Sequence, residues 1–144
     1  MSANTELETT IWIIDDDDVE ALLIREALNR SVEPVEFHAF SDAESVKSAL
    51  ANTSIPRPDL VILDYFLPDA EAPELLPVLR ESLDWTPIVV LSALTEKASV
   101  RRCFDARASM FVEKPPSYAE LSSAMARISD VWLNVALRPG RASN

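Results

Sequence analysis

The residues best suited to chemistry in this chain are carboxylates that directly follow two apolar stretches. Asp15 and Asp16 open a run of four aspartates after Ile11–Ile14, and Asp64 closes the stretch 60–63. Apolar runs of this length, rich in β-branched residues, are typical of buried strands in a parallel sheet. Ligands bind such sheets beyond the carboxyl ends of the strands, so neighbouring strands would bring these acids together. Carboxylates held so near to one another repel, and a cation between them, usually Mg²⁺, relieves this repulsion.

Helix capping is the other interpretation of the aspartate run. Acidic side chains at a helix start accept backbone hydrogen bonds and complement the helix dipole. We assign Asp17 and Asp18 to that role alone. For Asp15 and Asp16 taken by themselves both interpretations stay open, and the second acidic strand end, at Asp64, favours a site.

Two further polar residues follow predicted strands: Ser92 comes after 88–91, and Lys114 comes after 109–113. Asp64 can act as a nucleophile toward a phosphoryl group and form an aspartyl phosphate, with Mg²⁺ between Asp64 and Asp16. Lys114 would supply a fixed positive charge, and the Ser92 hydroxyl would donate to a phosphoryl oxygen. Each alone is an ordinary capping serine or solvated lysine, but their joint position at strand ends indicates a phosphoryl-transfer site.

Strand and helix candidates alternate five times along the chain. The predicted strands cover 11–14, 35–40, 60–64, 88–91 and 109–113, and the predicted helices cover 19–29, 41–51, 73–81, 96–106 and 117–137. Ser41–Glu44 and Ser117–Glu120 have the pattern of a capping box, and Pro73 suits a first helical turn. Short connections between such units predict an α/β fold, a doubly wound five-stranded parallel sheet with helices on both faces.

The bulk composition predicts one globular domain. Of the 144 residues 48% are hydrophobic and 26% are charged, which excludes a disordered or membrane-embedded chain. Because Cys103 is the single cysteine and no signal peptide or spanning segment is evident, we expect a structural thiol and a cytoplasmic protein. We expect a flexible N-terminus over 1–9, a domain over 10–137 and a tail over 138–144.

The charge pattern points to protein partners. A net charge of −11 disfavours direct binding to nucleic acid, which requires clustered basic residues. The single glycine, Gly140, excludes a glycine-rich phosphate loop. Arg101, Arg102 and Arg107 form a local basic patch that fits either a solvated helix face or a docking site.

Four stretches of the chain resemble the receiver domain of two-component response regulators. They are 11–17, 58–69, 87–93 and 111–115, and the match extends over about residues 10–130. The resemblance implies a flavodoxin-like sheet with strand order 2-1-3-4-5. It also implies that Asp64 accepts phosphate from a histidine kinase or a histidine phosphotransfer protein. By this resemblance the chain is not an enzyme, because it would catalyse only its own phosphorylation and dephosphorylation.

The resemblance also implies roles for the residues around Asp64. Asp15 and Asp16 would form an acidic pocket facing the metal, with Mg²⁺ held by Asp16, Asp64 and the backbone carbonyl of Phe66. Lys114 matches the lysine of the family.

Ser92 and Phe111 fall at the family's switch positions, where the hydroxyl moves toward the phosphoryl group and the aromatic ring turns inward. The face made by helix 96–106, strand 109–113 and the last helix would contact a downstream protein or a second copy of the chain.

The chain departs from the family pattern at four positions. Ala72 and Arg107 stand where the family commonly has glycine; a positive φ would strain them, so we expect the local loop to differ. Phe66 and Leu94 stand where many relatives have polar side chains. We expect these apolar groups to screen a phosphoryl group on Asp64 from water and to lengthen its lifetime.

Two other functions compete with a phosphoacceptor. A phosphatase of the haloacid dehalogenase type also forms an aspartyl phosphate, but it needs a second acid two residues after the nucleophile, where this chain has Phe66. A pseudo-receiver would bind partners without phosphorylation. The complete set of site residues argues against it, while Ala72 and Arg107 keep it open.

Overall fold

The computed structural model describes residues 8–31 and 35–135. Within these ranges a single parallel sheet contains the strands β1 (Thr9–Ile14), β2 (Val35–Phe40), β3 (Leu60–Asp64), β4 (Ile88–Ser92) and β5 (Met110–Glu113). Their order across the sheet is β2-β1-β3-β4-β5, which confirms the predicted topology. The predicted domain limits at residues 9 and 137 and the tail fall in or next to segments outside the described residues.

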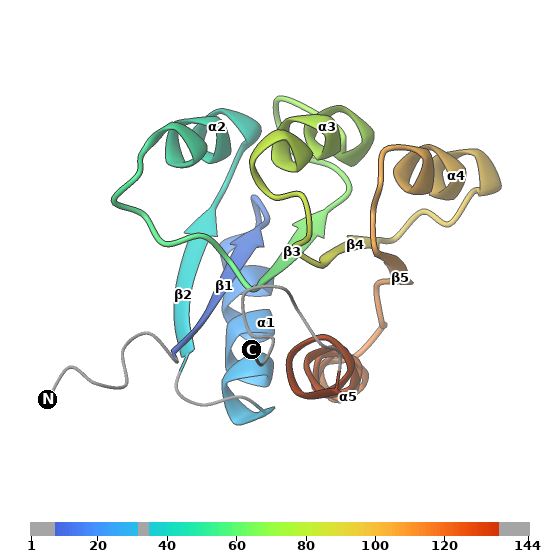
Figure 1. The fold of residues 1–144 in the computed structure, drawn as a ribbon. Helices are drawn as coiled ribbons and strands as arrows, with labels where there is room; N and C mark the ends of the chain where they lie inside the picture. The colour runs from blue at the N-terminus through green and yellow to red at the C-terminus, as the bar shows by residue number, and fades with distance from the viewer. Residues whose placement is uncertain (1–7, 32–34, 136–144) are drawn as a thin grey trace, which may run out of the picture.

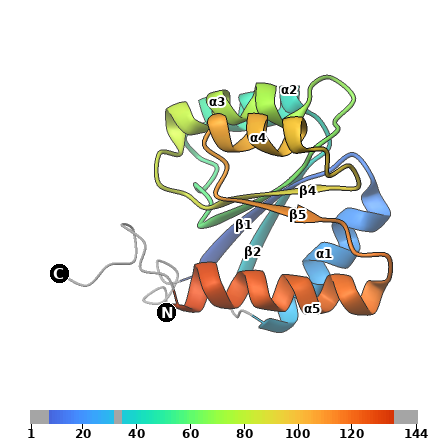
Figure 2. The ribbon, with the colours of Figure 1, turned by 90° about the vertical axis from the view of Figure 1, so that its right-hand side faces the viewer.

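Helices cover both faces of the sheet, as the doubly wound prediction requires. They are α1 (Asp18–Ser31), α2 (Ala43–Ala51), α3 (Ala72–Ser82), α4 (Lys97–Asp105) and α5 (Tyr118–Ser129), which continues into the π-helical segment η2 (Asp130–Val135). Helices α2, α3 and α4 lie on one face, and α1 and α5 lie on the other (Figures 1 and 2). In the described part of the chain, no helix is both long enough and apolar enough to cross a bilayer.

The strands are apolar on both faces because each face packs against helices. In β1, Trp12 and Ile14 join the core under α2, α3 and α4, while Ile11 and Ile13 join the core over α1 and α5. This alternation follows from the two-residue period of a strand. All four side chains are buried, and each contributes about 1.5–3 kcal/mol of hydrophobic stabilisation. The buried sheet can therefore position polar groups at the carboxyl ends of its strands.

The core also contains the single cysteine. Cys103 of α4 is fully buried, and burial raises the pKa of its thiol to about 11. A thiol that stays protonated and inaccessible is a packing residue, in keeping with the predicted structural role.

The register of the sheet brings the predicted strand ends to one edge. Ile14 pairs with Leu63, Asp64 with Leu91, and Ser92 with Glu113. The residues that follow β1, β3, β4 and β5 consequently lie near one another.

The helix caps differ in one respect from the prediction. The capping residue of α2 is Asp42 rather than Ser41: its side chain accepts a hydrogen bond from the amide of Ser45 at 2.8 Å. Asp69, from the loop after β3, accepts hydrogen bonds from the amides of the first two residues of α2 at 2.8 and 3.0 Å. A carboxylate accepts two such bonds, so this loop is tied to α2. Ser117 caps α5 as predicted.

The backbone before β5 contradicts the expectation that the loop at Arg107 avoids a positive φ. Arg107 has φ 75°, the one positive φ of a non-glycine residue among those described. Arg80, itself buried, holds this conformation, because its Nε and Nη2 atoms donate to the Arg107 carbonyl at 2.9 and 2.7 Å. Ala72 is the first residue of α3, where a helical φ requires no glycine.

Candidate functional site

Three of the predicted site residues meet at the carboxyl edge of the sheet. Asp15 follows β1 and is 4% exposed, and Asp64 ends β3 and is 7% exposed. Lys114 follows β5, and its Nζ lies 2.9 Å from Asp64 Oδ1. The Lys114 amide also donates to the Ser92 carbonyl at 2.9 Å, which fixes the lysine to the end of β4. The site thus contains a buried carboxylate with an ammonium group directly against it.

The structure adds a residue that the sequence analysis did not assign. Glu20 is in the first turn of α1, and its Oε1 atom lies 2.8 Å from Lys114 Nζ. The contact is an ion pair rather than an aligned hydrogen bond. Oxygen atoms of Asp15, Glu20 and Asp64 all lie within 4.8 Å of one another. An acid in a first helical turn ordinarily serves the helix dipole, so the sequence carried no separate signal for Glu20.

Burial and charge shift the protonation equilibria of the site. Burial raises the pKa of Asp15 to about 8, and the neighbouring Glu20 adds to the shift. Burial also raises the pKa of Asp64 although Lys114 opposes it. Burial alone would lower the pKa of Lys114, but Glu20 and Asp64 outweigh it and raise that pKa. For Glu20, burial would raise the pKa, but the interactions with Asp15 and Lys114 outweigh burial and hold that pKa below its ordinary value.

The acidic cluster fits a divalent cation. Asp15 accepts a hydrogen bond from the amide of Asp17 through Oδ1, but its buried Oδ2 atom has no hydrogen-bond partner among the described residues. Buried carboxylate oxygens without partners are costly. Mg²⁺ and Ca²⁺ bind oxygens at about 2.0–2.6 Å, so ligands of one ion lie at most about 5 Å apart. The spacing of the three carboxylates meets this limit.

Asp16 and the Phe66 carbonyl, the other predicted metal ligands, are not among the three clustered side chains. Asp16 is exposed and is not one of the three clustered acids, although its charge contributes to the raised pKa of Asp64. Phe66 lies two residues after Asp64, and its side chain is 44% exposed. Leu94, the other predicted screening residue, is 45% exposed. Both apolar side chains are thus exposed, and their screening of Asp64 stays a prediction.

The predicted switch residues lie on β4 and β5, the two strands on one side of β3. Ser92 is buried, and its Oγ accepts a hydrogen bond from the Leu94 amide at 3.0 Å. Phe111 is half-buried and packs against the core under α4, with its ring 6.4 Å from that of Tyr65.

Tyr65 connects the residue after Asp64 to α4. Its hydroxyl accepts a hydrogen bond from Arg102 Nη2 at 2.6 Å, although the ring itself is buried. Arg102 also pairs with Glu71 at 3.6 Å. Arg107 instead pairs with Asp84 at 2.8 Å, so two members of the predicted basic patch are already paired within the chain.

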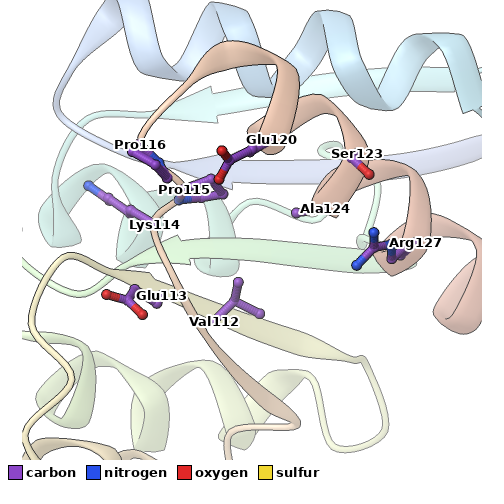
Figure 3. Close-up of a pocket in the computed structure, with 9 residues that line it drawn as sticks. All are labelled: Val112, Glu113, Lys114, Pro115, Pro116, Glu120, Ser123, Ala124 and Arg127. Carbon is purple, nitrogen blue, oxygen red and sulfur yellow. The ribbon is translucent and has the colours of Figure 1, made fainter.

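A pocket of about 550 Å³ lies between β5 and α5, next to Lys114 (Figure 3). It is lined by Val112, Glu113, Lys114, Pro115, Pro116, Glu120, Ser123, Ala124 and Arg127. The pocket belongs to the face for which a partner is predicted.

Known proteins are similar to this chain in sequence. The family model of the response regulator receiver domain matches residues 11–126. The KDP operon transcriptional regulatory protein KdpE of Escherichia coli is 31% identical over 119 residues, 81% of this chain and 49% of KdpE, so the chain spans about half the length of that relative.

Solved structures agree with the fold. The phosphorylated cyanobacterial phytochrome response regulator RcpA is 26% identical with a TM-score of 0.86, and the match covers 92% of this chain and 99% of RcpA. The Mn²⁺-bound form of response regulator Rcp1 is 23% identical with a TM-score of 0.82, and the match covers 91% of this chain and 99% of Rcp1. This chain therefore belongs to the family of response regulator receiver domains, the signalling phosphoacceptors of two-component systems.

Proposed function

We propose that this chain is a working phosphoacceptor, in which Asp64 takes a phosphoryl group from a histidine kinase or a histidine phosphotransfer protein. The observation that carries the proposal is the contact of 2.9 Å between Lys114 Nζ and Oδ1 of the nearly buried Asp64. A fixed ammonium at that distance can stabilise charge on an incoming phosphoryl group without rearrangement of the sheet. The phosphorylated state of the related RcpA supports the same assignment.

The transfer exchanges one bond to phosphorus for another. An Asp64 carboxylate oxygen attacks the phosphorus atom of phosphohistidine; an O–P bond forms while the N–P bond breaks. The electron pair stays on the imidazole nitrogen, which takes a proton from solvent. Lys114 keeps its own proton, in line with its raised pKa, and faces the phosphoryl oxygens throughout. Ser92, in the next strand, donates its hydroxyl to one of them.

The proposed cofactor is Mg²⁺, facing Asp15, Asp16, Asp64 and the backbone carbonyl of Phe66. When bound, it neutralises charge on the carboxylates and the phosphoryl oxygens. The unpartnered, buried Asp15 Oδ2 supports a cation at this position. The Mn²⁺-bound form of the related Rcp1 supports it as well.

The output is a change in a protein-binding surface. We propose that the Ser92 hydroxyl and the Phe111 ring respond to phosphorylation and alter the face formed by α4, β5 and α5. That face would then bind a downstream protein or a second copy of the chain, in the cytoplasm. The route from Asp64 is short, since Phe111 already lies against Tyr65.

Intact mass after incubation with phosphoramidate tests the proposal. We expect one Mg²⁺-dependent phosphoryl adduct in the native chain and none in Asp64→Asn. Asp105→Asn, which removes an exposed acid of α4, is the matched control and should retain the adduct. A folded native chain that forms no adduct would instead indicate a pseudo-receiver, a binding module that acts without phosphorylation.

A further inference from the structure

Glu20 is the least expected carboxylate of the site. It is supplied by α1 rather than by a strand end, yet its Oε1 atom is buried inside the site and faces Lys114 at 2.8 Å. The family resemblance gave Asp16 as a metal ligand. In the structure Asp16 is exposed, and Glu20 takes a place in the acidic cluster.

The charges of the cluster do not balance within the described residues. Asp15, Glu20 and Asp64 offer three carboxylates within 4.8 Å, and Lys114 offers one ammonium that contacts only the latter two. Asp15 is 4% exposed, its buried Oδ2 has no hydrogen-bond partner among the described residues, and one of its oxygens lies within 4.8 Å of those of Glu20 and Asp64. With all three carboxylates ionised, one ammonium leaves two negative charges unbalanced; a divalent ion beside Asp15 would balance them, and the oxygen spacing suits it.

We propose that Glu20 is a direct ligand of this divalent cation, together with Asp15 and Asp64. The inference rests on the proposed function, because it takes the ion to be the one that supports phosphorylation of Asp64. The Glu20 carboxylate also contacts Lys114, so a cation held by Glu20 would compete with the ammonium for that carboxylate.

Two substitutions separate ligation from a general charge effect. Glu20→Gln removes the charge and weakens the ligand, whereas Glu20→Asp keeps the charge but shortens the side chain by one methylene group. Asp18→Asn is the matched control: Asp18 is exposed in the same first turn of α1, and the change in net charge equals that of Glu20→Gln. A ligand role requires that both Glu20 variants lose affinity and that Asp18→Asn does not.

The measurement is a titration of the full chain with Mn²⁺ alone, in which electron paramagnetic resonance reports the free ion. We expect one site, with affinity at least about tenfold weaker in Glu20→Gln and in Glu20→Asp, and less than about threefold weaker in Asp18→Asn. Circular dichroism of each variant checks the fold. If Glu20→Gln does not fold, Glu20→Asp decides the outcome.

Three results would overturn the assignment: native affinity in Glu20→Gln, native affinity in Glu20→Asp, or no Mn²⁺ binding by the native chain. The first two leave the proposed function intact if phosphoramidate still modifies Asp64. Conversely, a native chain that binds Mn²⁺ through Glu20 but forms no phosphoryl adduct would refute the proposed function and leave the ligand assignment standing.

Discussion

Asp15 should make the cation-free protein less stable as the pH rises. Its pKa in the native state is about 8, against an ordinary value of 3.8, with burial as the main cause. The native state therefore holds the proton more tightly than the unfolded chain. The stability that this group contributes is fully present below about pH 4 and is lost as the pH rises to about 8. Asparagine, which is neutral at every pH, should remove this loss.

The size of the effect follows from the pKa shift. One pKa unit corresponds to about 1.4 kcal/mol, so a shift from 3.8 to about 8 sets a ceiling of roughly 6 kcal/mol. Ionised carboxylates near a surface relax and become hydrated, so we expect Asp15→Asn to stabilise the cation-free chain by roughly 3 kcal/mol at about pH 8 and by less at about pH 5. The pKa of Asp64 is also raised, so Asp64 changes the stability with pH in the same direction, whereas Glu20 changes it in the opposite direction. Both effects are present in the native chain and in the variant.

Urea unfolding with EDTA present, followed by tryptophan fluorescence, measures both stabilities. Asp18→Asn is the control, because it removes an exposed acid outside the buried cluster and should change the stability little. The reasoning is refuted if Asp15→Asn and the native chain show the same dependence on pH. It is also refuted if the variant is the less stable protein at about pH 8.

Three further outcomes are expected. At the left-handed position 107, Arg107→Gly should be more stable than Arg107→Ala by about 1 kcal/mol in urea unfolding, and the opposite order would contradict the strain at φ 75°. Arg80→Met should lower the free energy of unfolding by about 3 kcal/mol or more in the same assay, because the backbone carbonyls that accept hydrogen bonds from Arg80 lose their donor. A smaller loss would mean that water replaces the donor. The double change Phe66→Asn with Leu94→Glu should shorten the lifetime of the phosphoryl adduct about tenfold by intact mass, and an unchanged lifetime would rule out screening by these exposed apolar groups.

Most of the fold was predictable from local signals. The strands β1 and β3 are buried on both faces, so their uninterrupted apolar runs were visible without any knowledge of the partners. Asp64 was predictable for the same reason, because it stands where such a run ends. Lys114 was predictable from its place directly after the half-buried strand β5. Their meeting at 2.9 Å then follows from the parallel register of the sheet.

The remaining differences concern positions that depend on tertiary contacts. Glu20 enters the site because α1 packs beside Lys114, and no pattern within α1 marks that neighbour. Asp42 rather than Ser41 caps α2, since serine and aspartate are both good caps and the chain path decides between them. Arg107 tolerates a positive φ because Arg80, distant in sequence, holds its carbonyl.

The most direct test of the account is the position of the phosphate. After phosphorylation with phosphoramidate and Mg²⁺, borohydride reduction converts an aspartyl phosphate to homoserine, which tandem mass spectrometry locates in the chain. We expect homoserine at position 64 alone, because among the described residues Asp64 is the one carboxylate at a strand end that pairs with Lys114. Homoserine at position 15 or 16, or an adduct that resists reduction, would contradict the assignment of Asp64 as the phosphoacceptor.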